Sequence, residues 1–226
     1  MERVAVFGGT GFIGSHLVRQ LVSAGVTATI LTRTGRPLNS LSSVLESVNV
    51  VYGDFQDESV YSDVLRDVDT VFHLVTTTFP NSALRSSIYD VSTNLLPTIR
   101  LLEECERRSV KKFVYLSSGG TVYGNQGCLP ITEETPLNPI SIYGNSKRLI
   151  ENYIQFFSKF SQIDITVLRV SNPYGPGQSL YGNQGLVAVL CQRILSGRPI
   201  QIYGDGSAAR DYIYIDDLIN AILLAS

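Results

Sequence analysis

The sequence predicts a doubly wound α/β domain, in which helices cover both faces of a parallel sheet. Six short apolar runs lack the polar alternation of strands that face water on one side. Helical patterns lie between these runs, as where Ile13, Leu17 and Leu21 recur four residues apart. Strands that alternate with helices in this way build a parallel sheet between two helical layers. The six expected strands cover residues 4–7, 29–32, 48–51, 70–74, 113–116 and 165–170.

Two later helices are expected over residues 94–107 and 146–160. In the second, the stripe formed by Leu149, Tyr153, Phe156 and Phe160 predicts the buried face. From residue 171 the composition changes to Pro, Gly and Tyr, which indicates a boundary between a first domain, 1–170, and a smaller lobe, 171–226. The chain ends inside a helical pattern, so we expect a lobe that is cut short.

The composition excludes several classes of protein. With 226 residues, 44% of them hydrophobic, the chain is long enough for a large folded domain, and its net charge of −2 offers no basic surface for nucleic acid. No apolar run approaches the roughly 20 residues of a membrane span, and the start of the chain does not resemble a signal peptide. Cys105, Cys128 and Cys191 are widely spaced, which favours reduced, packed thiols over a disulfide or a metal site. We expect a soluble, cytoplasmic protein without a metal or a nucleic-acid or membrane partner.

A glycine-rich turn follows the first expected strand and precedes a helix. It contains Gly8, Gly11 and Gly14, with Phe12 and Ile13 between the last two. Such glycines let the backbone approach a pyrophosphate, whose charge the helix N-terminus stabilises. The turn predicts a dinucleotide site formed by these five residues, and a ligand-free structural turn is the alternative.

The residues after the second and third strands bear on the choice of cofactor. No acid follows the second strand to bind ribose hydroxyls, whereas Arg33 is placed to pair with a 2′-phosphate. This arginine slightly favours NADP over NAD, unless it stacks on adenine or faces water. Asp54, with Phe55 beside it, is expected to contact the adenine, and a loop cap is the other interpretation of Asp54.

Tyr143 and Lys147 are four residues apart in an expected helix, and therefore share one face. A free phenol, with a pKa near 10, is a poor base at neutral pH. A neighbouring ammonium and the positive nicotinamide of an oxidised cofactor would favour the phenolate and lower the pKa of Tyr143. We therefore predict that Tyr143 is the acid/base, and that Lys147 assists it and holds the nicotinamide ribose.

Together these motifs resemble the extended short-chain dehydrogenase/reductase family, specifically its NAD-dependent epimerases and dehydratases such as UDP-glucose 4-epimerase. The resemblance covers essentially the whole chain and implies a Rossmann-like first domain followed by a nucleotide-sugar-binding lobe. It rests on residues 8–14, 53–54, 72–74, 94, 117–124, 143–147, 169–175 and 204–217.

The resemblance also implies roles for further residues. Leu74, Thr76, Asn94 and Ser117 would join Tyr143 and Lys147 around the cofactor. Asn172 and Arg210 would contact the nucleotide diphosphate of the substrate, with a surface ion pair to Asp205 or Asp211 as the alternative for Arg210. Family members also pair through the helices that correspond to residues 94–107 and 146–160, which predicts a homodimer.

One position departs from the family pattern. Gly119 stands where family members usually carry the Ser or Thr that shares the substrate proton with tyrosine. Thr121 is the first candidate to supply that hydroxyl and to contact substrate, and Ser118 is the second.

The same loop favours one chemistry of the family. Family dehydratases carry an Asp-Glu pair here, and its decarboxylases carry Glu where Thr121 stands, whereas residues 119–121 hold no carboxylate. We therefore expect a nucleotide-sugar epimerase that inverts C4 of a nucleoside-diphosphate hexose through a 4-keto sugar, using NAD or NADP. A 4-reductase, dehydrogenase or dehydratase of the same family is the alternative, and a non-catalytic NAD(P)-binding regulatory protein is the alternative of another class.

Overall fold

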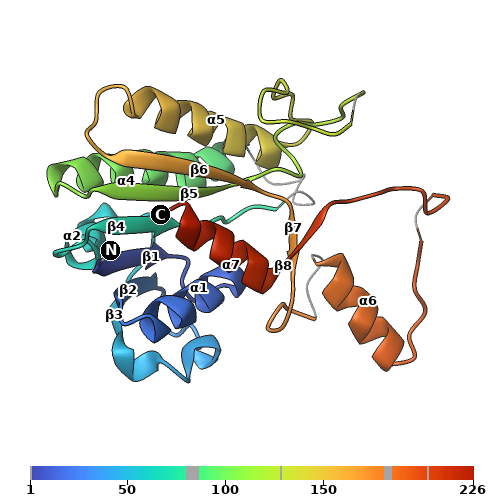
Figure 1. The fold of residues 1–226 in the computed structure, drawn as a ribbon, viewed down its shortest axis with the longest axis horizontal. Coiled ribbons are helices and arrows are strands. Elements are labelled where there is room, and N and C mark those ends of the chain that lie inside the picture. The colour runs from blue at the N-terminus through green and yellow to red at the C-terminus, as the bar shows by residue number, and fades with distance from the viewer. Residues whose placement is uncertain (1, 80–86, 128, 181–184, 203) are drawn as a thin grey trace.

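The computed structural model describes residues 2–79, 87–127, 129–180, 185–202 and 204–226 (Figure 1). Six parallel strands form one sheet in the order β3-β2-β1-β4-β5-β6, which confirms the predicted doubly wound, Rossmann-like architecture. The order changes direction between β1 and β4, and the carboxyl ends of these two strands form the crevice where such sheets bind ligands. The strands are β1 (Arg3–Phe7), β2 (Thr27–Thr32), β3 (Val48–Tyr52), β4 (Thr70–His73), β5 (Lys112–Ser118) and β6 (Asp164–Val170).

Helices cover both faces of the sheet, and each face has its own core. On one face α1 (Phe12–Ser23) and α7 (Ile215–Leu224) pack on Val4 and Val6 of β1. On the other, α2 (Tyr61–Val64), α4 (Leu96–Arg107) and α5 (Ile142–Phe157) pack on Ala5 and Phe7. The side chains of β1 alternate between two apolar layers, which is why this strand reads as a continuous apolar run.

Shorter elements connect these layers. A four-residue helix, α3 (Ser87–Asp90), continues through a π-helical turn (Val91–Leu95) into α4, so the helix predicted over 94–107 begins earlier than expected. Short 3₁₀ turns occupy Asn39–Leu41, Leu45–Ser47 and Glu58–Val60.

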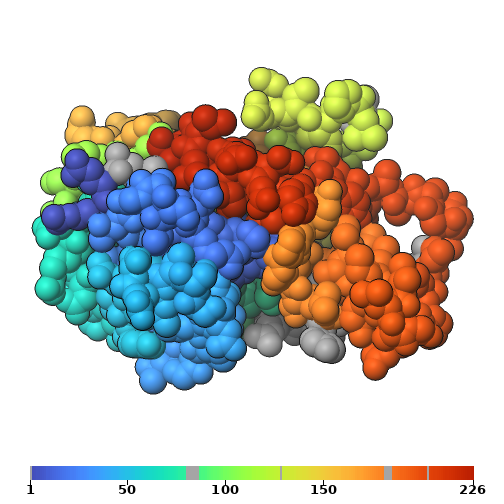
Figure 2. All heavy atoms as spheres, turned by 60° about the horizontal axis from the view of Figure 1, so that its bottom comes forward, coloured from blue at the N-terminus to red at the C-terminus, as the bar shows by residue number. Residues whose placement is uncertain are grey.

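Residues 171–226 form two different kinds of structure. β7 (Asn172–Tyr174) pairs in parallel with β8 (Tyr212–Tyr214), and α6 (Leu186–Leu195) lies beside this small sheet, away from the main one (Figure 1). In contrast, α7 packs against α1, and Leu218, Ile219 and Ile222 enter the core of the large sheet. Figure 2 shows the α1 and α7 segments side by side on one surface of the molecule.

The prediction for the buried face of α5 was wrong. Tyr153, Phe156 and Phe160 of the predicted stripe are 47%, 61% and 72% exposed. The helix buries instead the face that carries Lys147, Ile150, Glu151 and Ile154. Sequence periodicity did not distinguish these faces, because the buried one includes two charged side chains whose partners come from elsewhere in the fold.

The cysteines differ from one another in their surroundings. Cys105 is buried and unpaired, as predicted, whereas Cys191 is exposed and the packing role predicted for it was wrong. Cys128 lies outside the described residues. Within the described ranges, no helix is long and apolar enough to cross a membrane, and no cluster of potential metal ligands occurs.

Candidate active site

The glycine turn brings three segments of backbone into contact at the carboxyl end of β1. Gly8 has φ +91°, and a Cβ atom there would lie 3.1 Å from the Leu74 carbonyl carbon. A Cβ on Gly14 would overlap the Gly8 carbonyl oxygen, so only glycine lets α1 start this close to β1. Gly11 is the N-cap of α1, makes no side-chain cap hydrogen bond, and no acid occupies the first turn. Since the backbone is bare and the helix end is uncapped, this turn suits a pyrophosphate.

The residues between and beside the glycines divide between the core and the surface. Phe12 and Ile13 open α1 and pack partly against the core, as does Leu74 after β4. Phe55 is buried, with its ring 5.8 Å from that of Phe7, so its side chain belongs to the core. Arg33 is exposed and directly follows β2.

Asp54 forms part of a turn at the end of β3. Its Oδ1 atom accepts hydrogen bonds from the Gln56 amide at 2.9 Å and from Gln56 Nε2 at 3.2 Å. This is the loop cap that the sequence left open as the alternative to an adenine contact.

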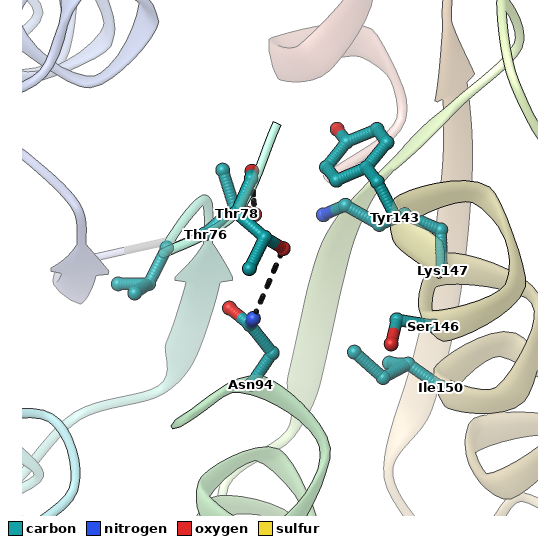
Figure 3. A pocket seen from close by; sticks show the side chains of 8 residues that line it. Thr76, Thr78, Asn94, Tyr143, Ser146, Lys147 and Ile150 are labelled. Carbon is teal, nitrogen blue, oxygen red and sulfur yellow. Dashed lines mark hydrogen bonds between the residues drawn. The ribbon is translucent and has the colours of Figure 1, made fainter. Parts of the chain in front are cut away.

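A small pocket lies between α5 and the segment that follows β4 (Figure 3). Tyr143 and Lys147 project into it from α5, while Thr76, Thr78 and Asn94 form the opposite wall. The Asn94 side chain fixes the threonine segment, because its Oδ1 accepts from the Thr77 amide at 2.9 Å and its Nδ2 donates to Thr77 Oγ1 at 2.8 Å. The structure thus brings five residues together from three distant segments of the chain.

The start of α5 sets the position of the Tyr143 phenol. The Ser141 hydroxyl caps the helix by accepting a hydrogen bond from the Gly144 amide at 3.0 Å. A Cβ on Gly144 would lie 2.7 Å from the Thr121 carbonyl oxygen, so glycine permits the helix to begin against the loop after β5. Next to this loop, the phenol forms a hydrogen bond with Ser118, the last residue of β5.

Lys147 is buried below Tyr143 and is held by β5. Its Nζ donates to the Leu116 carbonyl at 2.9 Å and lies 4.8 Å and 5.8 Å from the ring centres of Tyr115 and Tyr143. Burial lowers the pKa of Lys147 to about 8, and the charges of Asp90 and Glu151 oppose this effect.

The pKa of Tyr143 is raised in the chain by itself, and the lowering expected beside an oxidised cofactor stays a prediction. Burial raises the pKa of Tyr143 to about 12, and a hydrogen bond with Ser118 opposes the rise. Desolvation dominates, because the phenolate would form in a largely enclosed site.

The hydroxyls after β5 have three different environments. Ser118 interacts with Tyr143, Ser117 donates to Glu151 Oε1, and Thr121 Oγ1 is buried without a hydrogen-bond partner in the described chain. A Cβ on Gly119 would lie 2.7 Å from the Arg169 carbonyl oxygen, so this backbone leaves no room for a side chain there. Of the two hydroxyls proposed from sequence, the structure places that of Ser118 at Tyr143.

A partly buried ion pair beside the site was missed by the sequence analysis. Arg169 donates to Glu151 Oε2 through two nitrogens, at 2.9 Å and 3.0 Å, and to the Tyr123 hydroxyl at 2.8 Å. A signal was present, because Glu151 is four residues beyond Lys147 and so shares its helix face. This pair ties α5 to β6 and to the loop after β5.

The two residues expected at a diphosphate lie near the small sheet. Asn172 Nδ2 donates to the Asp211 carbonyl at 2.7 Å and joins β7 to the segment before β8. Arg210 is exposed and donates to the Ala209 carbonyl at 2.6 Å. Arg210 makes no ion pair with Asp205 or Asp211 in this structure, so neither of the alternative pairs forms.

Comparisons with known proteins agree with this fold. The model of the NAD dependent epimerase/dehydratase family matches residues 4–226. A UDP-glucose 4-epimerase of Thermotoga maritima, solved with UDP-glucose, is 35% identical with a TM-score of 0.92 over 99% of this chain and 72% of its own. A UDP-glucose 4-epimerase of Thermus thermophilus, solved with NAD, is 32% identical with a TM-score of 0.88 over 99% and 74%. A dTDP-4-dehydro-6-deoxyglucose reductase of Escherichia coli is 32% identical over 97% and 71%.

Proposed function

Because the chain belongs to the NAD-dependent epimerase/dehydratase family, we propose that it is a nucleotide-sugar epimerase that inverts C4 of a nucleoside-diphosphate hexose. The observation that carries this proposal is the pocket in which Tyr143 and Lys147 face Thr76, Thr78 and Asn94, with Ser118 beside the phenol. Such an arrangement suits reversible removal of a proton from a sugar hydroxyl.

Tyr143, Ser118 and Lys147 each take a part in the proposed chemistry. The Tyr143 oxygen, in its phenolate form, takes the proton of the C4 hydroxyl and later returns it, and the Ser118 hydroxyl orients the phenolate by donating a hydrogen bond to it. The Lys147 ammonium, fixed on the Leu116 carbonyl, provides positive charge below the phenol. A bound NAD(P) supplies the hydride acceptor and donor. Inversion then requires that the 4-keto sugar turns over within the pocket before it is reduced.

The cofactor is proposed to lie across the carboxyl ends of β1 and β4. Gly8, Gly11 and Gly14, with the amides of Phe12 and Ile13, would hold the pyrophosphate, and Leu74, Thr76, Asn94, Ser117 and Lys147 would flank the nicotinamide half. The Phe55 ring belongs to the core, so we propose that the backbone of Phe55 contacts the adenine. Asp54 is proposed to lie beside the adenine as well. Arg33 supports NADP, whereas the Thermus thermophilus relative was solved with NAD. Dissociation constants for both dinucleotides decide between them.

The substrate is proposed to be a UDP-sugar or a related nucleotide sugar. The Thermotoga maritima relative was solved with UDP-glucose, and the lobe from residue 171 supplies Asn172 and Arg210, whose donors suit a diphosphate. We keep the division between residues 1–170 and 171–226, with α7 returning to the core of the first domain.

Rival activities of the same family differ in what they release. Residues 118–121 hold no carboxylate, which disfavours a dehydratase because elimination of water needs its own acid and base. A reductase, the activity named for the Escherichia coli relative, would consume cofactor stoichiometrically, whereas an epimerase recycles it. A non-catalytic binding protein would bind cofactor and leave every sugar unchanged.

The test is to incubate the protein and each cofactor with UDP-, dTDP-, GDP- and CDP-hexoses and to follow the C4 epimers by NMR. We expect one nucleotide sugar to be converted to a mixture of its C4 epimers with far less than one equivalent of cofactor. Tyr143→Phe should lower turnover by at least about a hundredfold while cofactor binding persists, because only the proton-transferring oxygen is lost. If cofactor binds but no sugar yields an epimer, the proposed activity fails and the chain is a non-catalytic binding protein.

A further inference from the structure

Asp90 is a buried acid that the proposed chemistry does not yet use. It ends α3, is 1% exposed, and is one of two carboxylates that are buried in the described chain. The other, Glu151, receives two hydrogen bonds from Arg169. Asp90 forms no ion pair within the described ranges. Since an isolated carboxylate is costly to bury, its charge requires another source of compensation.

The contacts of Asp90 place it next to the pocket. Its Oδ1 accepts from the Thr78 hydroxyl and, at 3.2 Å, from Asn94 Nδ2, and both of these residues line the pocket opposite Tyr143 and Lys147 (Figure 3). Its Oδ2 is buried and makes no hydrogen bond in the described part of the chain. Both α3 and the π-helical turn pack against α5.

On the opposite side of the pocket, the Lys147 ammonium forms no ion pair within the described residues. Its ammonium carries three N–H groups but, within the described residues, makes a single hydrogen bond, to the Leu116 carbonyl at 2.9 Å. Around it lie the phenols of Tyr115 and Tyr143, His73, which burial keeps neutral by lowering its pKa to about 3, and Glu151, which Arg169 neutralises. Of the acids that raise the pKa of Lys147 against the effect of burial, Asp90 acts more strongly than Glu151.

We propose that Asp90 is a positioning residue, the buried counter-charge that keeps the Lys147 ammonium charged and, through Thr78 and Asn94, holds the opposite wall of the pocket in place. The two buried acids then have separate tasks, since Glu151 balances Arg169 and Asp90 balances Lys147. The bearing of Asp90 on turnover rests on the proposed function, whereas its effect on Lys147 does not.

The direct test follows the Lys147 ammonium by NMR titration of its ε-carbon in the full chain without cofactor or substrate. Asp90→Asn keeps an oxygen that accepts from Thr78 but removes the charge. We expect the midpoint of Lys147 to fall by about one pH unit, because an opposite charge nearby favours the charged amine. Asp63→Asn, which removes an exposed charge paired with Arg66, is the matched control and should leave the midpoint unchanged. An unshifted midpoint in Asp90→Asn would overturn the proposal, since a purely structural Asp90 predicts that result.

A second measurement needs no variant and covers the case in which Asp90→Asn does not fold. In the unmodified chain, the carboxyl carbon of Asp90 should show an inflection at the pH where the Lys147 ε-carbon titrates. A flat carboxyl signal across that pH would also overturn the proposal.

Kinetics then separate this inference from the proposed function. If the epimerase activity is found, Asp90→Asn should move the alkaline limb of the kcat profile to lower pH by the same interval as the Lys147 midpoint. If no sugar is turned over, the proposed function fails, but the two NMR results still decide whether Asp90 and Lys147 interact.

Discussion

Ser118 and Thr121 show how single residues depend on their surroundings. Ser118 ends β5 and Thr121 lies in the loop that follows, and the sequence analysis ranked Thr121 first and Ser118 second as the source of the hydroxyl. In the structure, a hydrogen bond with Ser118 opposes the rise in the pKa of Tyr143, while Thr121 Oγ1 is buried and has no hydrogen-bond partner in the described chain. The difference comes from the direction in which the loop turns, which the local sequence does not encode.

Replacing these two hydroxyls should therefore have unequal effects. Ser118→Ala should lower turnover by more than about tenfold, because positioned proton-transfer groups contribute at least that much. Thr121→Val should keep turnover within about twofold and leave the free energy of unfolding unchanged or higher, since it removes an unsatisfied buried hydroxyl. Steady-state rates and urea unfolding measure both. If Thr121→Val lowers turnover more than Ser118→Ala does, Thr121 and not Ser118 supplies the hydroxyl.

The buried Lys147 ammonium should make stability depend on pH. The pKa of Lys147 is about 8 in the folded chain and 10.5 as its ordinary value. Between these values the unfolded chain binds more protons, so the free energy of unfolding rises with pH, by at most about 1.4 kcal/mol per pH unit for one proton. The cost of burying the charge is fully present below pH 8.

Urea unfolding of Lys147→Met at several pH values from 7 to 10 tests this dependence. We expect the rise between pH 8 and 10 to be smaller in Lys147→Met than in the unmodified chain. Lys159→Met, which removes an exposed ammonium beyond the end of α5, should follow the unmodified chain. Parallel curves for the unmodified chain and Lys147→Met would refute the lowered pKa.

At the scale of elements, the strands were easier to predict than the helices. A strand buried on both faces reads as an apolar run, and all six such runs became parallel neighbours in one sheet. The α5 helix has two apolar stripes, and the sequence indicated the wrong one because Lys147 and Glu151 interrupt the buried stripe. Those charges are compatible with burial only because β5, β6 and α3 supply their partners.

The contact between β1 and α1 is an element-scale property that depends on one atom. Gly14→Ala places a methyl group on the Gly8 carbonyl oxygen, so α1 must move away from the strand. We expect a loss of at least about 2 kcal/mol in the free energy of unfolding, as for overpacked cores, together with weaker dinucleotide binding. Gly127→Ala is the control, because a Cβ there meets nothing within 4 Å. Equal stability of the two variants in urea would show that α1 does not need this close approach.

At the scale of the whole molecule, the exposed aromatic side chains of α5 and of the turn after it are a candidate contact surface for a second copy of the chain. The rings of Phe156 and Phe160 lie 5.1 Å apart and, with Tyr153, form an apolar surface. We propose that this surface, with α4, forms the homodimer that the family resemblance implies. An amphipathic helix with a second apolar face is expected to bury it against another helix.

Sedimentation equilibrium tests the assembly. The unmodified chain should have the mass of a dimer, and Phe156→Glu should shift it toward the monomer because a charge in an apolar helix interface is unfavourable. Leu195→Glu is the matched control, since Leu195 is 88% exposed on α6, and it should leave the mass unchanged. A monomeric mass for the unmodified chain would refute the homodimer.

The sequence by itself determined the parallel sheet, the glycine turn and the pairing of Tyr143 with Lys147 on one helix face. These features follow from local rules, namely burial on both faces of a strand, the steric freedom of glycine and the period of a helix. Only the tertiary structure decided which hydroxyl lies at the phenol, which face of α5 is buried, and which acids balance Lys147 and Arg169. Those outcomes depend on charges and carbonyl groups that lie far apart along the chain and meet only when the sheet brings its carboxyl edge together.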